Sequence, residues 1–290
     1  MKVNYLNNKD ILKEIHKSKN TYCYYTKPEY ADYDIILSGV KQLNKKNILQ
    51  GRRNRAERLG KLNYDASIAN GIKRKLEEFE IKYTKIPATD VVFRVMMWDH
   101  IPTVEDLSKK VVPSEDDELL ITEYDDDVAP APAKYIKCNF PPFQHYMVDE
   151  EGEPHCVGRS HWKGDLDAGL FSKEHGMMTP KLGHMFIKLC ERYATRSNWR
   201  GYTYNDEMRS QALLQLSQIG LQFDESKSQN PFAYYTAAIT NSFTRVLNIE
   251  KRNQNLRDDI LEMNGLTPSY TRQGLGSWGG NPTSSEYHDE

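Results

Sequence analysis

The sequence lacks the features that mark secreted and membrane proteins. Its 290 residues contain only four cysteines, and none of these forms a Cys-x-x-Cys pair. The start from Met1 to Glu14 is polar and has no signal-peptide core. No stretch approaches the ~18 apolar residues of a membrane span, because the longest candidate, Val91 to Trp98, is interrupted by Arg94. The cysteine pattern predicts a reduced cytosolic protein without a disulfide framework, and we expect no membrane partner.

The fraction of apolar residues and the net charge are also low. Aliphatic, aromatic and cysteine residues together make up 38% of the chain, and the mean hydropathy is −0.74. The 39 lysine and arginine residues nearly balance the 41 aspartate and glutamate residues. Such a chain can bury a core of limited size, and much of its length should be loop, solvated helix face or partner surface. Near-zero net charge also excludes a general basic coating, so any nucleic-acid site must be local.

Common catalytic signatures are missing. The sequence has no GxxxxGK[ST] phosphate loop, no GxSxG nucleophile elbow and no paired-carboxylate motif. Five residues have zinc-compatible side chains in a spacing that matches no standard zinc pattern: Cys138, His145, His155, Cys156 and His161. We interpret them as packed or exposed residues, and we expect no enzymatic activity, cofactor or bound metal. The alternative is a histidine-based, metal-dependent nuclease, which would need carboxylates such as Asp165 and Asp167.

Charge is unevenly distributed along the chain. The range from Lys41 to Lys85 has thirteen basic and five acidic residues, whereas Glu105 to Asp127 has ten acidic residues and two lysines. An alternating Ala-Pro stretch, Ala129 to Ala133, follows, so this region predicts an exposed linker. A second interpretation is that the acidic run masks the basic one until a partner binds. The basic residues that could contact DNA or a polymerase surface, or else form a solvated helix, are Lys45, Lys46, Arg52, Arg53, Arg55 and Arg58.

Three helices are predicted after residue 180. The first has an apolar stripe at helical spacing from Leu182 to Tyr193. Asp206 can cap the second, which should run through Gln222. Asn230-Pro231 places an N-cap before a proline at the first helical position, so the third helix should run from Phe232 to Leu261. Asn264-Gly265 is a fitting stop.

The rest of the chain gives weaker patterns. Asn7-Asn8 can cap a first helix, and Asp65 can cap another that extends to Phe79. Tyr146 to Val157 predicts a hairpin around Glu150-Glu151-Gly152. We therefore expect a mainly α fold with a helical N-terminal part and a mixed α+β, loop-rich insertion. The expected regions are a basic helical region at 1–100, an acidic Ala/Pro linker at 101–134, a hairpin and loop insertion at 135–179, a helical domain at 180–263 and a flexible tail at 264–290.

One face of the third predicted helix has an unusual composition. At steps of three and four residues it presents one aromatic, amides and guanidinium groups without a carboxylate: Tyr234, Ala238, Asn241, Arg245, Asn248 and Arg252, with Lys251 beside them. Arginine and asparagine bond phosphates or base edges, and a tyrosine stacks on a base. An ordinary solvated helix face would have the same composition.

The order of motifs around this helix resembles region 2 of bacterial sigma factors, and most closely the late-promoter sigma factors of T-even-type bacteriophages. The resemblance covers residues 181–260 and 1–15. The motifs that carry it are Asn4 to Leu12, Gly201-Tyr202-Thr203, Phe223 to Lys227 and Asn230 to Tyr234. It implies a sigma region 2-like helical domain near the C-terminus and the cytoplasm of an infected bacterium as the location.

The resemblance also implies two binding surfaces. The helix before the turn would dock on the clamp helices of the largest subunit of the host RNA polymerase core, through Asp206, Glu207, Ser210, Gln211, Leu214 and Ser217. The next helix would read a promoter element of the −10 type and separate its strands. The tyrosine that acts in strand separation in sigma factors corresponds to Tyr234, or to Tyr235 if the gap in the alignment with that family is placed differently. Since Tyr235 lies on the apolar stripe, we assign Tyr234 to DNA and Tyr235 to the core. The DNA-binding set would be completed by Ala238, Asn241, Arg245, Asn248, Lys251 and Arg252.

Some features depart from that family. Ala237-Ala238 stands where bacterial sigma factors usually have a tryptophan pair, and the tail from Gly274 to Glu290 lacks the acidic-hydrophobic motif that binds the phage sliding clamp. We see no helix-turn-helix after residue 260, so recognition of a −35 element is not expected. The sequence predicts a phage-encoded sigma factor that brings host polymerase core to late promoters, with or without a phage co-activator. A helical DNA- or RNA-binding regulator that does not act through polymerase is the first alternative, and the nuclease is the second.

Overall fold

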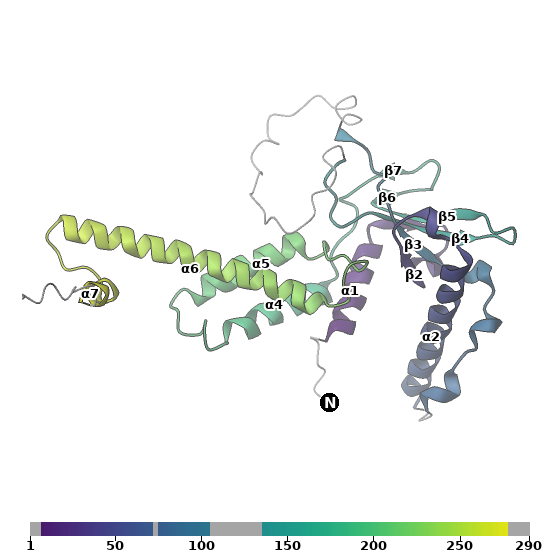
Figure 1. Cartoon of the computed structure of the whole chain (residues 1–290), viewed down its shortest axis with the longest axis horizontal. Helices are drawn as coiled ribbons and strands as arrows, with labels where there is room; N and C mark the ends of the chain where they lie inside the picture. Colours follow the sequence, from purple (N-terminus) through teal and green to yellow (C-terminus); the bar gives the residue numbers. More distant parts are fainter. Residues whose placement is uncertain (1–6, 72–74, 105–134, 278–290) are drawn as a thin grey trace, which may run out of the picture. The chain divides into compact units, whose positions relative to one another are not determined.

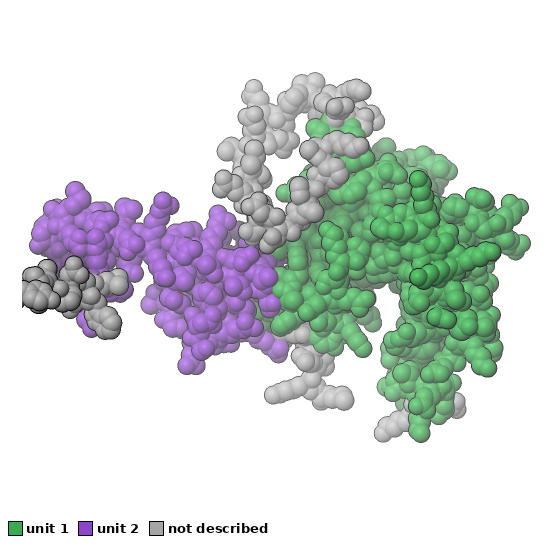
Figure 2. Space-filling model, in the orientation of Figure 1, with its two compact units in different colours: residues 1–189, 217–235 green, residues 190–216, 236–290 purple. Residues whose placement is uncertain are grey.

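A computed structural model of the chain describes residues 7–71, 75–104 and 135–277 (Figure 1). The acidic run and the Ala-Pro stretch lie outside these residues. The chain forms two compact units, residues 1–189 with 217–235 and residues 190–216 with 236–290 (Figure 2). Three helices contribute residues to both units: α4 (Pro180–Ala194), α5 (Asn205–Ile219) and α6 (Pro231–Met263).

A five-stranded mixed sheet is the centre of the first unit. Its order is β1 (Cys23–Tyr25), β5 (Pro154–Ser160), β4 (Phe143–Val148), β3 (Phe93–Met96) and β2 (Ile35–Leu37). Neighbouring strands are antiparallel except for β2 and β3, which are parallel. Strands β4 and β5 form the predicted hairpin, and Gly152 takes the positive φ of 90° that its turn requires. A separate two-stranded sheet pairs β6 (Trp162–Lys163) with β7 (Leu170–Phe171).

Helices lie against this sheet in the first unit. α1 (Asn8–Asn20) begins where the Asn7 side chain accepts the Asp10 N–H at 3.0 Å, as the sequence predicted. α2 (Lys45–Ala69) packs against the sheet through small residues: a Cβ added at Gly51 would lie 2.5 Å from Val91 Cγ1. The connecting segments contain the 3-10 helices η1 (Pro28–Ala31), η2 (Val40–Gln42), η3 (Leu76–Phe79), η4 (Tyr83–Lys85) and η5 (Ala88–Asp90).

The second unit has its own aromatic core. The rings of Tyr193 and Trp199 both meet Phe243 of α6 edge-on, with centroids 5.3 Å apart in each case. Met208, Ala212 and Leu216 of α5 are completely buried. Beyond Gly265, which has a φ of 70°, the chain turns back into α7 (Tyr270–Ser277) beside the end of α6 (Figure 1).

The expectation of a mainly α fold with a sigma region 2-like helical domain is wrong. Of the described residues, 53% are helical, and the sheets of five and two strands make the fold a mixture of helix and sheet. Strands β1, β2 and β3 are only three or four residues long. A strand is recognised in a sequence by apolar and polar residues that alternate over about 4–8 residues. These strands are too short to show that alternation clearly, so the N-terminal region was interpreted as helical.

Other boundaries differ in detail. Asp65 does not begin a helix, because it lies within α2, and Leu76–Phe79 is a 3-10 turn. The described part of the expected flexible tail contains α7. The start of α6 is as predicted: the Asn230 side chain accepts the Ala233 N–H at 3.2 Å, and Pro231 is the first helical residue.

Candidate nucleic-acid and protein-binding surfaces

Helix α6 carries an exposed polar and basic face in the second unit. This basic face consists of Asn241, Arg245, Asn248, Lys251 and Arg252, all of which are exposed. The opposite side of the same turns is buried through Ile239, Phe243 and Val246. The helix therefore orients the basic face outward by packing its apolar side inward.

No carboxylate of the described residues neutralises the cations of the basic face. Among the ion pairs of the described residues, none involves Arg245, Lys251 or Arg252. By contrast, Arg272 pairs with Asp259 and Glu262 further along the unit, at 2.6 and 3.0 Å. Three unpaired cations and two amides on one helix face are suited to a polyanion, because phosphates accept hydrogen bonds from these groups.

Two members of the predicted DNA-binding set are not on this surface. Tyr235 has no exposed area, its hydroxyl donates to the Gly220 carbonyl at 2.5 Å, and its ring meets Phe186 at 4.8 Å. Burial raises the pKa of its phenol well above the usual value, so the hydroxyl remains a donor. Ala238 is 9% exposed. Of the two candidate tyrosines, Tyr235 is therefore a core residue, as its place on the apolar stripe predicted, and we remove Ala238 from the DNA-binding set because it too is packed inside the fold.

Tyr234 lies in the first unit and is half-buried. Its ring contacts Phe223 edge-on, with centroids 5.6 Å apart, and Tyr235 at 5.3 Å. Burial raises the pKa of its phenol. One side of the ring is thus fixed by neighbouring aromatics while the residue keeps exposed area, and a fixed ring is the kind of group on which a base stacks.

Helix α1 holds the segment that carries Tyr234. The Lys19 ammonium, only 1% exposed, donates to the Phe223 carbonyl and to Glu225 Oε2, both at 2.6 Å. Burial lowers the pKa of Lys19, and the Glu225 charge offsets part of that effect. For Glu225, burial raises the pKa, but the charges of Lys19 and Arg94 outweigh it and hold the pKa below the usual value. The lowered pKa keeps the Glu225 carboxylate charged near neutral pH, and its Oε2 lies 2.6 Å from the Lys19 amine.

A second contact from α1 reaches the first turn of α6. The Asn8 side chain accepts the Phe232 N–H at 3.1 Å, which satisfies one of the free amides at the helix start. The turn before α6 and its first turn are thus both attached to α1. Asn8 and Phe232 belong to two of the motifs that carry the family resemblance, Asn4 to Leu12 and Asn230 to Tyr234. The hydrogen bond between them gives a physical reason for both motifs to be present in one chain.

The predicted polymerase-docking residues of α5 are exposed. In the second unit, Asp206, Glu207, Ser210, Gln211 and Leu214 are all exposed, and Ser217 is exposed in the first. Leu214 has 55% of its area exposed. Internal hydrogen bonds organise the polar groups, since the Gln211 amide donates to Glu207 at 3.0 Å. A surface of carboxylates, amides and one leucine is complementary to a partner that combines basic and apolar residues.

Half of the basic residues of α2 are used inside the first unit. Arg52 donates to the carbonyls of Ile86 and Thr84 at 2.5 and 3.2 Å. Arg55 and Arg58 both pair with the buried carboxylate of Asp34, at 3.4 and 2.7 Å. Arg52, Arg55 and Arg58 are therefore structural residues, and the proposed contact of this helix with DNA or polymerase is reduced to the exposed Lys45, Lys46 and Arg53.

The histidine and cysteine set does not assemble. His145 is completely buried, and its ring nitrogens contact Arg94 Nε at 3.0 Å and the Tyr30 carbonyl at 2.6 Å. His161 is buried against the Phe140 ring, and burial lowers its pKa to about 3. Cys138 donates to the Ile136 carbonyl at 3.4 Å. Within the described residues, no three His, Cys, Asp or Glu side chains are grouped closely enough to hold a metal ion.

Arg94 is a residue whose role the sequence did not reveal. It is 1% exposed, and its guanidinium carbon lies 3.9 Å from the Tyr33 ring and 3.8 Å from the Phe143 ring. The only sequence signal was that this arginine interrupts an apolar run. Its position in the middle of a buried strand makes it a structural residue, held between two aromatic rings.

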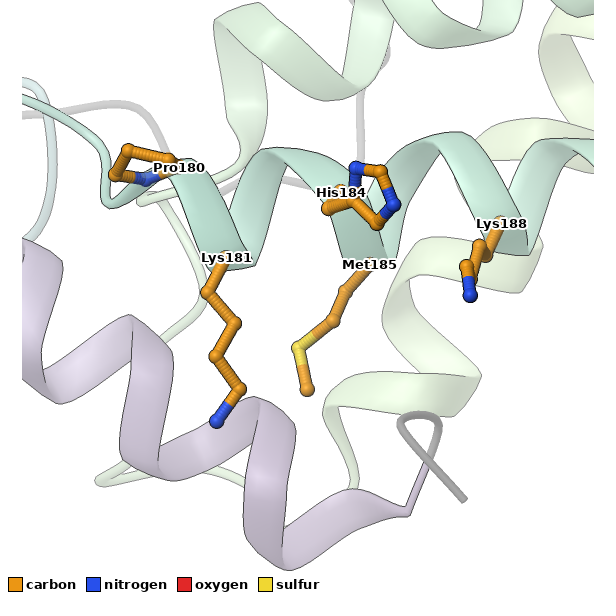
Figure 3. A pocket seen from close by; sticks show the side chains of 5 residues that line it. All are labelled: Pro180, Lys181, His184, Met185 and Lys188. Carbon is orange, nitrogen blue, oxygen red and sulfur yellow. The ribbon is translucent and has the colours of Figure 1, made fainter. Parts of the chain in front are cut away.

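A hollow on α4 offers little chemistry. Its volume is about 380 Å³, and it is lined by Pro180, Lys181, His184, Met185 and Lys188. Figure 3 shows Lys181 and Met185 pointing toward α1, where the Lys181 amine pairs with Glu14 at 3.1 Å. The polar groups lining the hollow are two amines and an imidazole from one helix, so we assign no reaction to it.

Two broader findings complete the description. In the part of the chain that the structure covers, no helix combines the length and apolar character needed to cross a bilayer. Comparisons with models of protein families, with curated proteins and with solved structures give no match.

Proposed function

We propose that the protein is a phage-encoded sigma factor that brings host RNA polymerase core to late promoters by recognising and melting a −10-type element. The observation that carries the proposal is the basic face of α6, where Arg245, Lys251 and Arg252 are exposed without a carboxylate partner in the described structure. The order of the sequence motifs supports the same function. The proposed partners are promoter DNA, the clamp helices of polymerase core and, where needed, a phage co-activator, in the cytoplasm of the infected cell.

The free-energy cost of opening the duplex assigns a separate task to Tyr234, to the basic face of α6 and to the exposed face of α5. Extracting a base from a duplex costs a few kcal/mol, and stacking it on an aromatic ring returns about 1–3 kcal/mol. Tyr234 would supply the stacking, and the basic face of α6 would bind the phosphates of the separated strand. The exposed face of α5 would bind the polymerase, which provides the remaining binding energy.

The direct test is run-off transcription with purified polymerase core on phage DNA, with and without the protein. Transcripts that start at late promoters only when the protein is present would support the proposal. If the protein neither binds core nor changes the start sites, the proposal is wrong.

Variants separate the two tasks. Tyr234→Ala should keep core binding and reduce promoter opening, measured by permanganate reactivity of unpaired thymines. Replacing Glu207 and Gln211 with lysine should weaken core binding in a pull-down, because like charges would meet a basic partner. Lys227→Gln changes an exposed charge outside both surfaces and is the control. Unchanged permanganate patterns for Tyr234→Ala would reject the melting role.

A regulator that binds nucleic acid without polymerase is the second candidate, because the same basic face of α6 would serve it. Such a regulator would bind duplex DNA or RNA as an isolated chain and would not co-purify with polymerase core. The salt dependence of binding by the isolated chain distinguishes the two, since a regulator that contacts several phosphates loses affinity steeply as salt rises.

A further inference from the structure

The second half of α6 exposes apolar side chains that its first half buries. Ile249, Leu256, Ile260 and Met263 have exposed fractions of 49%, 58%, 53% and 86%. Ile239 and Val246, earlier in the same helix, are buried in the second unit. An apolar stripe of this length on an exposed helix is a typical protein-binding feature.

These residues continue one seam along the helix. We define the seam as the residues that follow each other at alternating steps of three and four: Ile239, Ser242, Val246, Ile249, Asn253, Leu256, Ile260 and Met263. A repeat averaging about 3.5 residues is the pattern of a coiled coil. The seam is buried as far as Val246 and open from Ile249 onward. Its open half is therefore built to pack against another helix.

The neighbouring segment of the same unit does not cover the seam. Asp258 accepts the Ser269 N–H and hydroxyl at 2.8 and 2.7 Å, and Gln254 donates to the same hydroxyl at 3.1 Å. These contacts join the segment before α7 to a different side of α6, since Gln254 and Asp258 are not seam positions. Asp258 is 3% exposed, whereas Leu256 and Ile260 stay open.

We propose that the seam pairs with the same seam of a second copy of this chain, in antiparallel orientation. In the register that places Ile249 against Ile260 of the second copy, Leu256 packs against Asn253, and Met263 lies at the end of the paired region because Val246 is already buried in its own unit. A symmetric pair of this kind uses one surface on both partners. The Asn253 amide, which donates to Glu250 Oε1 at 3.3 Å, keeps a polar partner at the edge of the seam.

The charges beside the seam select this partner and this orientation. In the antiparallel register Glu250 faces Arg257 of the second copy, and Arg252 faces Asp259 of the second copy, whose carboxylate also pairs with Arg272 of its own chain at 2.6 Å. Each contact occurs twice by symmetry, so all four pairs have opposite signs. In a parallel pair Arg252 would face Arg257 of the second copy, which is repulsive. A parallel pair would also bring Arg245 beside Glu250 and would therefore mix attractive and repulsive contacts, whereas both flanking contacts of the antiparallel register join opposite charges.

The paired region from Ile249 to Met263 is short. Interfaces below about 1,200 Å² usually belong to weak or transient complexes, so we expect a dissociation constant on the order of micromolar. Arg252 is shared with the basic face, but Glu250 and Arg257 belong to neither proposed binding surface, so the self-pairing can be tested apart from the transcription role. The proposal can be tested on the full chain without polymerase or DNA.

Sedimentation equilibrium of the full chain across the micromolar range tests the proposal. The wild type should show a reversible monomer–dimer equilibrium. Leu256→Asp should abolish it, whereas Leu62→Asp, which changes an equally exposed leucine of α2, should not. Circular dichroism should show that both variants keep the helical content of the wild type.

A charge exchange tests the orientation. Glu250→Arg and Arg257→Glu should each weaken self-association by about tenfold or more, because each converts two attractive contacts into repulsive ones. The double variant with both exchanges should regain the affinity of self-association, because the opposite charges then face each other again. An equal mixture of the two single variants should associate as well as the wild type for the same reason. A monomer at all concentrations, a dimer that survives Leu256→Asp, or a double variant as weak as the single ones would each overturn the proposal.

Discussion

Replacing Lys19 with methionine should strongly destabilise the first unit. Its ammonium is buried, pairs with Glu225 and also donates to the Phe223 carbonyl. Methionine fills a similar volume but leaves a buried carboxylate without a counter-charge and a carbonyl without a donor. Removing one member of a buried ion pair costs about 3–5 kcal/mol, which is a large part of the ~5–15 kcal/mol that stabilises a typical domain.

The stability lost in Lys19→Met should depend on pH in a defined direction. In the wild type the pKa of Glu225 is held below its usual value, so its contribution to stability is present above the unfolded pKa and is lost as pH falls through the folded pKa. In Lys19→Met, burial without the ammonium should raise the pKa of Glu225, and the carboxyl should take up a proton. The stability difference between the two proteins should therefore shrink as pH falls below the usual range of a glutamate and be largest near neutral pH.

Urea unfolding of the full chain, combined with hydrogen exchange of peptides from each unit, measures this effect. Two readouts are needed because a chain with two units need not unfold in one step. Lys17→Met is the matched control: Lys17 also pairs with a carboxylate, Glu14 at 3.6 Å, but its side chain is 53% exposed, so its loss should cost at most about 1 kcal/mol. Adding Glu225→Gln to Lys19→Met should recover part of the stability. A loss below about 1 kcal/mol for Lys19→Met, or a loss that does not change with pH, would refute the role of the buried pair.

Three further results are expected. Asp34→Ala should destabilise the first unit by about 3–5 kcal/mol in urea unfolding, because its buried carboxylate pairs with two arginines and accepts the Val92 N–H at 3.0 Å; a change near zero would contradict this role. Gly51→Ala should cost about 1–3 kcal/mol by thermal unfolding, because the added methyl would overlap the side chain of Val91, which precedes β3, and a neutral result would mean that α2 can move away. Arg245→Ala should lower the salt dependence of DNA binding by polymerase holoenzyme by about one unit of slope, whereas Arg272→Ala, which removes a paired arginine, should leave the slope unchanged.

Local chemistry made the helix starts predictable. Asn7 caps α1, and Asn230 with Pro231 starts α6, because each of these signals acts within one turn of the backbone. The hairpin between β4 and β5 was predictable for the same reason, since Gly152 and its neighbours fix the turn. The outward direction of Arg245 and Asn241 followed from the apolar stripe on the opposite side of α6.

Distant contacts explain what the sequence did not reveal. β1 pairs with β5, where Cys23 lies opposite Ser160, and neither segment shows in isolation that it needs the other. Arg55 and Arg58 looked like surface charges because their carboxylate partner, Asp34, precedes them by more than twenty residues. Ala238 was placed on the wrong side because it lies at the border between the exposed and buried sides of α6, where a small residue gives no hydrophobic signal.

The ion pair between Lys19 and Glu225 joins groups that are 206 residues apart. At a synthesis rate of about 5–20 residues per second, the carboxylate is made about 10–40 s after the lysine. During that interval the ammonium has to stay in water, because burying it alone would be unfavourable. The last turn of α1 can therefore reach its final position only after Glu225 has been synthesised, although α1 itself is made long before.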